Sequence, residues 1–494
     1  MSHFGWIDGG IVGLYLLATM AAGLAVRRYV GGVEDFLLAG REMDVHLGIA
    51  SLAATEFGIV TCMYAAESGY RYGFSGAVPG ILMALAMFVV GWTGFCVKPL
   101  REASVMTLPE LFERRFGAGV RRASGVVIVL GGLLNMGVFL RMGGEFLMTV
   151  TGIGATAAGG ESWAASHRLE LTMSALLLMV AVYTILGGML SVLVTDFLQF
   201  VVMSIGLVAV TYLLLGKVGF AALADTVEAR LGPGGFNPLV HPEMGWPYVL
   251  FYALFNLGVV LTWQTSLQRV MAAKDSRTGQ RIYVGTAFFF VCRFLIPGLW
   301  GIAALHALGP AAPGVTSLSA MPTWLAGFLP VGLMGLLVAA MLAADMSTDS
   351  SYMLTWASVI YNDIVAPWRR PGWTDQKGLL LNRLLVAAIG VFLLLYGLWY
   401  PLRGDLLDYI GVTATIYLAS MSTLLVACCY WPRATQRGAA AAIVVGAAIP
   451  VAYLVLEQTT PAVRTSIGPH WSGILAYVGA ALAMVVGSLS QEAA

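Results

Sequence analysis

The stretch from Ala343 to Ser351 reads Ala-Ala-Asp-Met-Ser-Thr-Asp-Ser-Ser and places hydroxyl and carboxylate side chains inside an apolar run. On a helix of 3.6 residues per turn, the spacing i, i+3, i+4 and i+7 puts four of its residues on one face. These are Ala344, Ser347, Thr348 and Ser351. Hard cations prefer oxygen ligands from hydroxyls, carbonyls and carboxylates. Serine and threonine in an apolar helix can instead bond back to carbonyls or join neighbouring helices, but the density of oxygen donors here favours cation binding.

A second stretch, from Ile49 to Thr61, combines Glu56 with hydroxyl residues and a glycine, Gly58, in another apolar run. A carboxylate beside a glycine in such a run suggests a broken helix, whose freed carbonyls could ligate a cation. The alternative is that the glycine only allows neighbouring helices to pack closely. Both stretches are therefore candidates for parts of a cation site.

The elements that carry these stretches are membrane-spanning helices. Of the 494 residues, 59% are hydrophobic and 11% are charged, whereas a soluble domain has about 25% charged residues. Each bilayer crossing takes roughly 20 apolar residues. Runs of that kind cover residues 6–26, 45–72, 79–99, 124–152, 169–187, 192–215, 246–271, 283–308, 328–361, 379–400, 406–430, 438–457 and 471–490. The sequence therefore predicts an all-α polytopic membrane protein with about 13 transmembrane helices.

Lysine and arginine gather on alternate loops, after the first, third, seventh, ninth and eleventh runs. Because cytoplasmic loops are richer in these residues, an odd number of spans puts the N-terminus outside and the C-terminus in the cytoplasm. The inner membrane of a bacterial cell is the expected location for a compact chain rich in alanine and glycine. The net charge of +1 argues against nucleic-acid binding, and no constellation of nucleophile and base or of metal ligands suggests an enzyme.

Ionisable side chains inside the predicted spans indicate either function or mutual pairing, because each costs at least ~2.5–3.5 kcal/mol at the centre of a helix. They are Glu56, Arg141, Glu145, Asp196, Arg293, Asp345 and Asp349. Asp345 and Asp349 share a helix face that is turned away from the hydroxyl face. These two acids and Glu56 could form ion-pair scaffolding, which we rank first, carry protons, or bind an ammonium group of a substrate.

Five further motifs follow one another along the chain. They are Glu34-Asp-Phe-Leu-Leu-Ala-Gly-Arg41, Thr107-Leu-Pro-Glu-Leu-Phe-Glu-Arg-Arg-Phe-Gly117, Gly187-Gly-Met-Leu-Ser-Val-Leu-Val-Thr-Asp-Phe-Leu-Gln199, Gln264-Thr-Ser-Leu-Gln-Arg-Val-Met-Ala-Ala-Lys274 and Asp408-Tyr-Ile-Gly411. On these motifs, over roughly residues 6 to 435, the chain resembles the sodium:solute symporter family, which includes carriers of sugars, proline, pantothenate, monocarboxylates and sialic acid. The resemblance implies sodium-driven symport of a small organic solute by alternating access. A proton-coupled carrier and a transporter-like sensor of the same fold are the alternatives.

The resemblance also implies a leucine-transporter-type core, in which two five-helix inverted repeats surround a site at the membrane midplane. The repeats would cover residues 45–215 and 246–430, and two peripheral C-terminal helices would cover 438–490. Together they would form a single transporter domain over residues 1–494. The first helix of each repeat is discontinuous in this architecture.

The family's main sodium site can be carried over residue by residue. The resemblance implies three backbone carbonyls and two hydroxyls as its ligands, from Ala54, Phe57, Ala344, Ser347 and Thr348. A second sodium, which some members hold, would take Asp196, Ser350 and Ser351 as ligands. Asp196 could instead be a carboxylate at a helix end near the cytoplasmic surface. One or two Na⁺ ions are therefore expected.

The substrate site departs from that of the sugar carriers, because Thr61 and Gly411 stand where those carriers have glutamine. Arg141 resembles an arginine that grips a substrate carboxylate in the sialic-acid branch, and arginine suits bidentate carboxylate binding. Arg141 could equally pair with Glu145, one helical turn away. The expected substrate is a small carboxylate or zwitterion. Its candidate contacts are Glu56, Thr61, Arg141, Thr262, Gln264 and Tyr409, and a candidate charge network comprises Asp345, Asp349 and Arg293.

Overall fold

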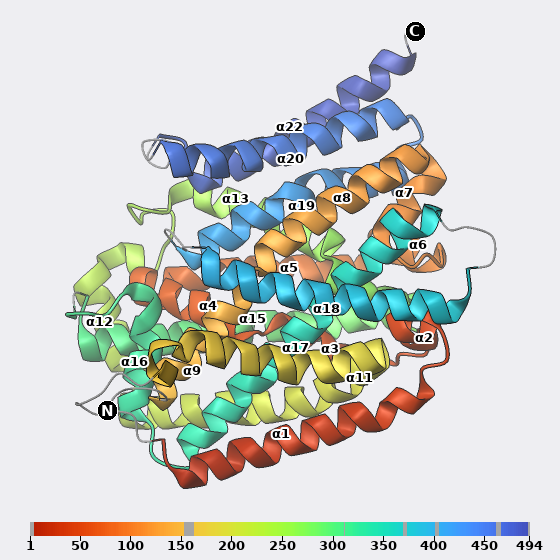
Figure 1. Cartoon of the computed structure of the whole chain (residues 1–494). Coiled ribbons are helices and arrows are strands. Elements are labelled where there is room, and N and C mark those ends of the chain that lie inside the picture. The colour runs from red at the N-terminus through yellow and green to blue at the C-terminus, as the bar shows by residue number, and fades with distance from the viewer. Residues whose placement is uncertain are drawn as a thin grey trace.

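The computed structural model describes residues 4–152, 163–310, 312–368, 373–400, 405–460 and 466–492. Long helices run side by side through this part of the chain (Figure 1). Helix α1 (Trp6–Val26) lies along one side, and the hairpin of α20 (Gln436–Thr459) and α22 (Gly468–Glu492) lies along the opposite side. The described residues contain no strand, and only an isolated bridge pairs Met43 with Ala273. The predicted all-α fold class is confirmed.

Between these borders the helices follow one another along the chain. In order they are α2 (Val33–Leu38), α3 (Val45–Glu56), α4 (Ile59–Tyr72), α5 (Val78–Thr93), α6 (Val97–Glu102), α7 (Leu108–Phe116), α8 (Ala118–Met136), α9 (Phe139–Thr151), α10 (Trp163–Ser166), α11 (Arg168–Lys217), α12 (Phe220–Leu231), α13 (Gly245–Thr262), α14 (Gln264–Ala272), α15 (Ser276–Leu308), α16 (Ser317–Phe328), α17 (Leu333–Val359), α18 (Asp375–Trp399) and α19 (Leu406–Tyr430). A π-helical turn, Ile360–Val365, extends α17.

Eleven helical runs in the described residues are long and apolar enough to cross a membrane. The run Arg168–Lys217 contains two of the predicted spans, and the run Ile59–Thr93 overlaps two others. Helix α11 has 50 residues but bends at Gly188, where φ is 54° and ψ is −145°. Without that bend it would reach roughly 75 Å at 1.5 Å per residue, more than twice the hydrocarbon thickness of a bilayer. Helices α4 and α5 form one run that turns at Gly73, where φ is +60°, and both pack against α15. These two bends account for the difference from about 13 predicted spans.

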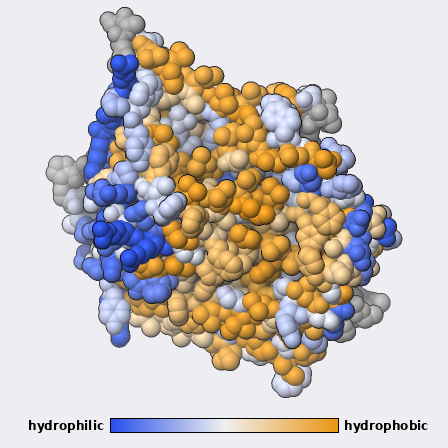
Figure 2. Space-filling model, turned by 180° about the vertical axis from the view of Figure 1, so that it is seen from behind, coloured by the Kyte–Doolittle hydropathy of each residue, from blue (hydrophilic) through white to orange (hydrophobic). Residues whose placement is uncertain are grey.

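The surface carries a broad apolar region between two hydrophilic ends (Figure 2). Large hydrophobic side chains are well exposed on the described part of the molecule, among them Leu14, Leu85, Leu178, Tyr212 and Leu395. Removing such area from water is favourable, and helices satisfy their own backbone hydrogen bonds in lipid. The surface is that of a multi-pass membrane protein.

Helix α17 lies at the centre of the fold, and every residue from Leu337 to Val359 is buried. It packs against α1, α3, α9, α11 and α18. The polar stretch of this helix is therefore inside the protein rather than facing lipid. Each of its hydroxyls and carboxylates must find a partner within the protein, because an unpaired buried polar group is costly.

Two crossings are broken near their middle. The first is interrupted between α3 and α4, where Phe57 has φ −106° and ψ 71° and Gly58 has φ −83° and ψ 170°. The break predicted beside Glu56 is therefore present. The second interruption, between α13 and α14, falls at Trp263, whose ψ of 115° is not helical. Both breaks lie in the first crossing of a predicted repeat, as expected for this architecture.

Candidate functional site

Helix α17 crosses the break between α3 and α4 at close range. The hydroxyl of Thr348 donates a hydrogen bond of 2.8 Å to the carbonyl oxygen of Thr55. A Cβ atom at Gly58 would lie 2.7 Å from the Thr348 Oγ1 atom, so glycine is what permits this approach. Ala54 and Phe57 flank the contact along the chain, and Ala344 lies one turn before Thr348 on α17. The two stretches with cation-binding character thus meet at the break.

Ser347, the other predicted hydroxyl ligand, donates to the Oδ1 atom of Asp196 at 2.6 Å. The other carboxylate oxygen of Asp196, Oδ2, accepts from the Ser51 hydroxyl at 2.5 Å. Ser350 donates to the carbonyl oxygen of Ser347 at 3.1 Å. The residues proposed for a second sodium therefore lie directly beside those of the first, with Asp196 fully buried.

Arg269 on α14 fills the same polar cage, and sequence reasoning did not single it out. Its Nη2 atom lies 3.2 Å from Oδ2 of Asp196, 2.7 Å from the Thr55 hydroxyl and 2.6 Å from the Ser351 hydroxyl. Both Arg269 and Asp196 have 0% exposed side chains, so the two charges neutralise each other inside the protein. The available signal was an arginine inside the apolar run 246–271, since charges within a span are functional or paired.

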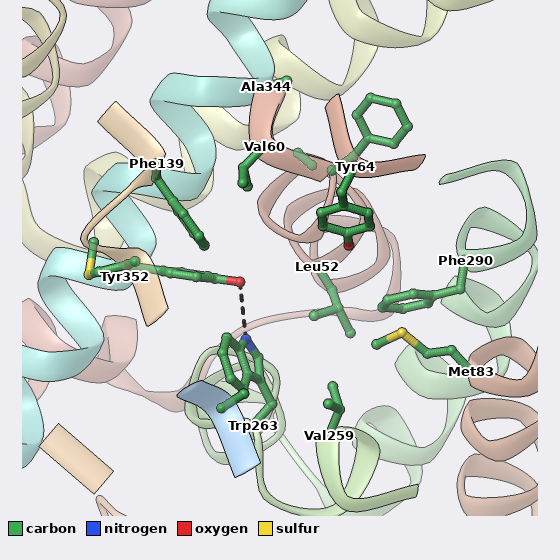
Figure 3. Close-up of a cluster of buried hydrophobic side chains, with 14 of the residues drawn as sticks. Leu52, Val60, Tyr64, Met83, Phe139, Val259, Trp263, Phe290, Ala344 and Tyr352 are labelled. Carbon is green, nitrogen blue, oxygen red and sulfur yellow. Dashed lines mark hydrogen bonds between the residues drawn. The ribbon is translucent and has the colours of Figure 1, made fainter. Parts of the chain in front are cut away.

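A pocket opens next to the break, with an unfilled volume of about 600 Å³ including its mouth. Its walls are mostly apolar and aromatic (Figure 3). Those walls include Val60, Tyr64, Met83, Phe139, Val259, Trp263 and Tyr352. The indole N–H of Trp263 donates to the Tyr352 hydroxyl at 3.1 Å. Thr348 also lines the pocket, which therefore adjoins the predicted main sodium site.

The charged groups of this pocket are Glu56 and Arg293. Their Oε2 and Nη1 atoms are 3.3 Å apart. Glu56 also accepts hydrogen bonds from Thr265 at 2.8 Å and from Ser266 at 3.4 Å. The pocket therefore contains an ion pair held on several helices.

Helix α15, which carries Arg293, begins after Asp275. The hydrogen bond from the N–H of Thr278 lowers the pKa of the Asp275 carboxyl.

Of the six predicted substrate contacts, Glu56 and Thr61 line this pocket. Arg141 does not: its Nε atom pairs with Glu145 at 2.8 Å, and its Nη1 atom donates to the carbonyl oxygen of Tyr400 at 3.1 Å. The alternative partner of Arg141, Glu145, is therefore the one that it contacts in this structure.

The other three predicted contacts also lie outside the lining of the pocket. Thr262 bonds back to the carbonyl oxygen of Gly258 at 2.8 Å. The Tyr409 hydroxyl donates to the carbonyl oxygen of Leu134 at 2.6 Å. Gln264 is buried, and its Nε2 atom has no hydrogen-bond partner within the described residues.

Asp345 and Asp349 are each 2% exposed. In the part of the chain that the structure describes, neither forms an ion pair, and Oδ2 of Asp345 and Oδ1 of Asp349 lack hydrogen-bond partners. A Cβ atom at Gly143 would lie 2.9 Å from the Asp345 carboxylate, so Asp345 faces α9. Arg293, the third member of the predicted charge network, instead pairs with Glu56. The structure does not bring these three residues into one network.

A second hollow lies beyond the pocket and shares Leu407 with it. Arg71, near the end of α4, forms ion pairs with Asp405 and with Glu243, the latter at 2.5 Å. The Tyr72 hydroxyl donates to Asp405 at 2.9 Å. This cluster ties the end of α4 to the start of α19 over one side of the pocket.

The fold has close counterparts among solved structures. A Na⁺-coupled sialic acid symporter in a substrate-bound outward-open state superposes with a TM-score of 0.80 at 17% identity, covering 99% of this chain and 98% of that chain. MhsT in complex with L-phenylalanine gives a TM-score of 0.53 at 13% identity, covering 91% and 99%. These similarities confirm the leucine-transporter-type fold.

Sequence comparisons point to one family. The sodium/glucose cotransporter of Vibrio parahaemolyticus is 27% identical over 489 residues, covering 90% of this chain and 84% of the relative. The osmoregulated proline transporter OpuE of Bacillus subtilis (strain 168) is 25% identical over 451 residues, covering 88% and 86%. The model of the sodium:solute symporter family matches residues 36–446. The chain therefore belongs to the sodium:solute symporter family, and it is a secondary transporter, not an enzyme, that moves a solute together with sodium.

Proposed function

We propose that this transporter couples the inward movement of a small organic carboxylate or zwitterion to sodium by alternating access. The main sodium ion would be held by three carbonyls and two hydroxyls, from Ala54, Phe57, Ala344, Ser347 and Thr348. The observation that carries this proposal is the hydrogen bond of 2.8 Å between Thr348 and the carbonyl oxygen of Thr55. It supports an oxygen-rich junction between α17 and the broken crossing, beside the pocket.

The hydrogen bonds at this junction suit a cation. A hydroxyl has one proton and two lone pairs, and Ser347 gives its proton to Asp196. Its lone pairs are then free to face a sodium ion, so Asp196 acts as a positioning residue. Outer partners of this kind orient ion ligands in many sites.

Coupling follows from the position of the ion between the two crossings. Sodium would tie α3 to α17 and thereby stabilise the form in which the pocket accepts the solute. By thermodynamic linkage, sodium and solute then raise each other's affinity by the same factor. The membrane potential adds about 2.3 kcal/mol per charge per 100 mV to inward sodium movement.

We propose a second sodium at Asp196, Ser350 and Ser351 only for a state in which Arg269 has moved away from Asp196. Arg269 already neutralises Asp196 at 3.2 Å, and another cation in the same buried cage would leave an unbalanced charge. A second ion therefore requires Arg269 to move away. The ratio of charge moved to solute moved in proteoliposomes distinguishes one ion from two.

The solute would contact Glu56 and Thr61 in the pocket, while Thr262, Gln264 and Tyr409 would join only after rearrangement. Arg141, which pairs with Glu145, would stay outside the solute site. We also propose that the repeats cover residues 45–215 and 246–430, with residues 438–490 peripheral to them. The N-terminus would lie outside and the C-terminus in the cytoplasm of a bacterial inner membrane.

The first test is the thermal stability of the purified protein in sodium, with potassium at equal ionic strength. A ligand that binds only the folded form stabilises it by about 2.7 kcal/mol at a hundred times its Kd. We expect a sodium-specific shift that is lost in Ser347→Ala/Thr348→Ala. Ser358→Ala is the matched control, because Ser358 lies on the same buried helix and, among the described residues, its hydroxyl donates back to the Thr355 carbonyl at 2.7 Å and to no other group.

Transport itself is tested in proteoliposomes. A sodium gradient should drive solute uptake, and a potassium gradient should not. Uptake driven by a pH gradient without sodium would contradict the sodium-coupled mechanism, and the buried acids Asp345 and Asp349 would then be the first residues to replace. Binding without uptake under any gradient would instead indicate a sensor.

A further inference from the structure

Arg293 lines the pocket beside the broken crossing, and part of its guanidinium has no hydrogen-bond partner among the described residues. Its Nη2 atom donates to the Tyr64 hydroxyl at 2.6 Å, and its Nη1 atom lies 3.3 Å from Glu56. Its Nε atom is buried without a hydrogen-bond partner among the described residues. Nη1 also donates to the sulfur of Met83 at 3.9 Å, so two of the five N–H donors of the arginine remain for a ligand. The side chain is 12% exposed, and it lines the pocket.

Both carboxylate oxygens of Glu56 have hydrogen-bond partners, whereas Nε of Arg293 has none among the described residues. One of its carboxylate oxygens accepts from Thr265 and Ser266, and the other faces Arg293. Glu56 therefore holds the guanidinium in place while leaving donors of Arg293 free. The planar guanidinium suits bidentate binding of a carboxylate, with charge-assisted hydrogen bonds about twice as strong as neutral ones.

The broken crossing adds a second preference for negative charge. Helix α4 has 14 residues and begins at Ile59, and residues of its first turn, Val60 and Thr61, line the pocket. The first N–H groups of a helix have no partner within it, and its dipole is positive at that end. Both the guanidinium and this helix end therefore favour an anion in the pocket.

The net charge of the pocket and the neighbouring sodium site determines whether an anionic or a zwitterionic solute fits better. Within the pocket lining Glu56 and Arg293 cancel each other, and sodium at the neighbouring site would add one positive charge. A solute with a single negative charge restores neutrality, whereas a zwitterion leaves one positive charge in a site of low dielectric. Uncompensated buried charge is costly, so a monoanion fits best when sodium is bound.

The walls of the pocket define the rest of the solute. Aromatic rings of Phe139, Phe255, Trp263 and Phe294 contribute to them. Besides Nε of Arg293, the buried polar atoms of the lining residues that lack partners within the described residues are the Tyr252 hydroxyl and Oδ1 of Asn135. A polyhydroxylated sugar would need many more partners, because unpaired buried polar groups are costly. The pocket instead suits a compact apolar or aromatic body.

We propose that Arg293 is the substrate anchor, and that the solute is a small organic monocarboxylate with an apolar or aromatic body. This inference rests on the proposed sodium-coupled transport, and it assigns to Arg293 the role that sequence reasoning gave to Arg141. Arg141, paired with Glu145 outside the pocket lining, is then not part of the carboxylate site.

The test is a panel of probes in thermal-shift measurements on the full-length protein, in sodium and in potassium. The panel contains propionate, lactate and benzoate, the neutral amides of these acids, the zwitterions alanine and phenylalanine, and glucose. We expect at least one carboxylate to stabilise the protein in sodium, and its amide to bind at least tenfold more weakly. Equal binding of acid and amide, binding only of zwitterions or glucose, or no binding by any probe would overturn the proposal.

Variants then locate the anchor. Arg293→Gln alone leaves Glu56 unpaired, so Glu56→Gln/Arg293→Gln is the variant of choice because it keeps the pocket neutral. Loss of a charge-assisted hydrogen bond predicts roughly tenfold to hundredfold weaker carboxylate binding in this double variant. Arg141→Gln should leave the affinity unchanged, and the opposite pattern would refute the assignment.

The response to sodium distinguishes failure of the substrate assignment from failure of the proposed sodium-coupled transport. If sodium still stabilises the protein through Ser347 and Thr348 but no carboxylate binds, only the substrate assignment fails. If sodium has no effect on the wild-type protein and drives no uptake, the proposed function itself fails. Retention of the sodium shift in Glu56→Gln/Arg293→Gln also shows that the double variant is folded.

Discussion

Neutralising Asp196 tests the buried ion pair beside the predicted sodium site. In Asp196→Asn, Arg269 would keep its charge at 0% exposure with no other carboxylate at ion-pair distance among the described residues. Removing one partner of a buried pair in this way costs about 3–5 kcal/mol. Ser51 and Ser347 donate to different carboxylate oxygens, so only one of them keeps an acceptor in the amide, and bonds to a charged acceptor contribute about 1.5–3 kcal/mol, against about 1 for neutral pairs. We therefore expect the free energy of unfolding to fall by about 3–5 kcal/mol.

A double-mutant cycle isolates the pair from its surroundings. Arg269→Gln should also be destabilising, because it leaves the Asp196 carboxylate buried without a counter-charge. Asp196→Asn/Arg269→Gln removes both charges and should be less destabilised than the sum of the single changes. For residues in contact, coupling energies reach about 3 kcal/mol, and we expect about 2 kcal/mol or more here.

The measurement is the free energy of unfolding in mixed micelles titrated with a denaturing detergent. Glu102→Gln is the control, because the Lys98–Glu102 pair is 4.0 Å apart with side chains 59% and 55% exposed, and such surface pairs contribute less than about 1 kcal/mol. Additive effects of the two single changes would refute the reasoning. So would an Asp196→Asn variant as stable as the control.

Two other substitutions test the junction and the cover of the pocket. In Gly58→Ala the new Cβ would lie 2.7 Å from Oγ1 of Thr348, so the stabilisation by sodium should decrease. The control is Gly9→Ala, whose new Cβ meets no atom within 4 Å and which should match the wild type. Equal sodium-dependent shifts in both variants would contradict this expectation. Asp405→Asn removes a charge from the cluster over the pocket and should speed thiol labelling of Leu407→Cys in a background without native cysteines. Unchanged labelling rates would show that the cluster does not restrict access.

Membrane insertion and the broken crossing could be predicted from the sequence because both depend on local features. A run of about 20 apolar residues is sufficient for a span, and such runs follow the observed helices from α1 to α22. The break at Phe57–Gly58 follows from a glycine beside a carboxylate in one such run. The oxygen-rich stretch of α17 was equally visible, since it depends only on residue types at helical spacing.

Number and division of the spans needed the backbone conformation as well. Gly188 turns one continuous helical run into two crossings through its positive φ of 54°. The sequence predicted the two crossings from their separate apolar runs, 169–187 and 192–215. It did not predict that the helix would continue around the bend.

The partners of the buried charges depended on tertiary structure alone. Asp196 and Arg269 are 73 positions apart in the sequence, and only the packing of α11 against α3 and of α14 against α3 and α17 brings them together. Arg141 and Arg293 are both arginines within apolar runs, yet Arg293 lines the pocket and Arg141 pairs with Glu145. The rotation of each helix about its axis decides which side chain faces the pocket. That rotation is set by contacts with neighbouring helices, which no single run of residues contains.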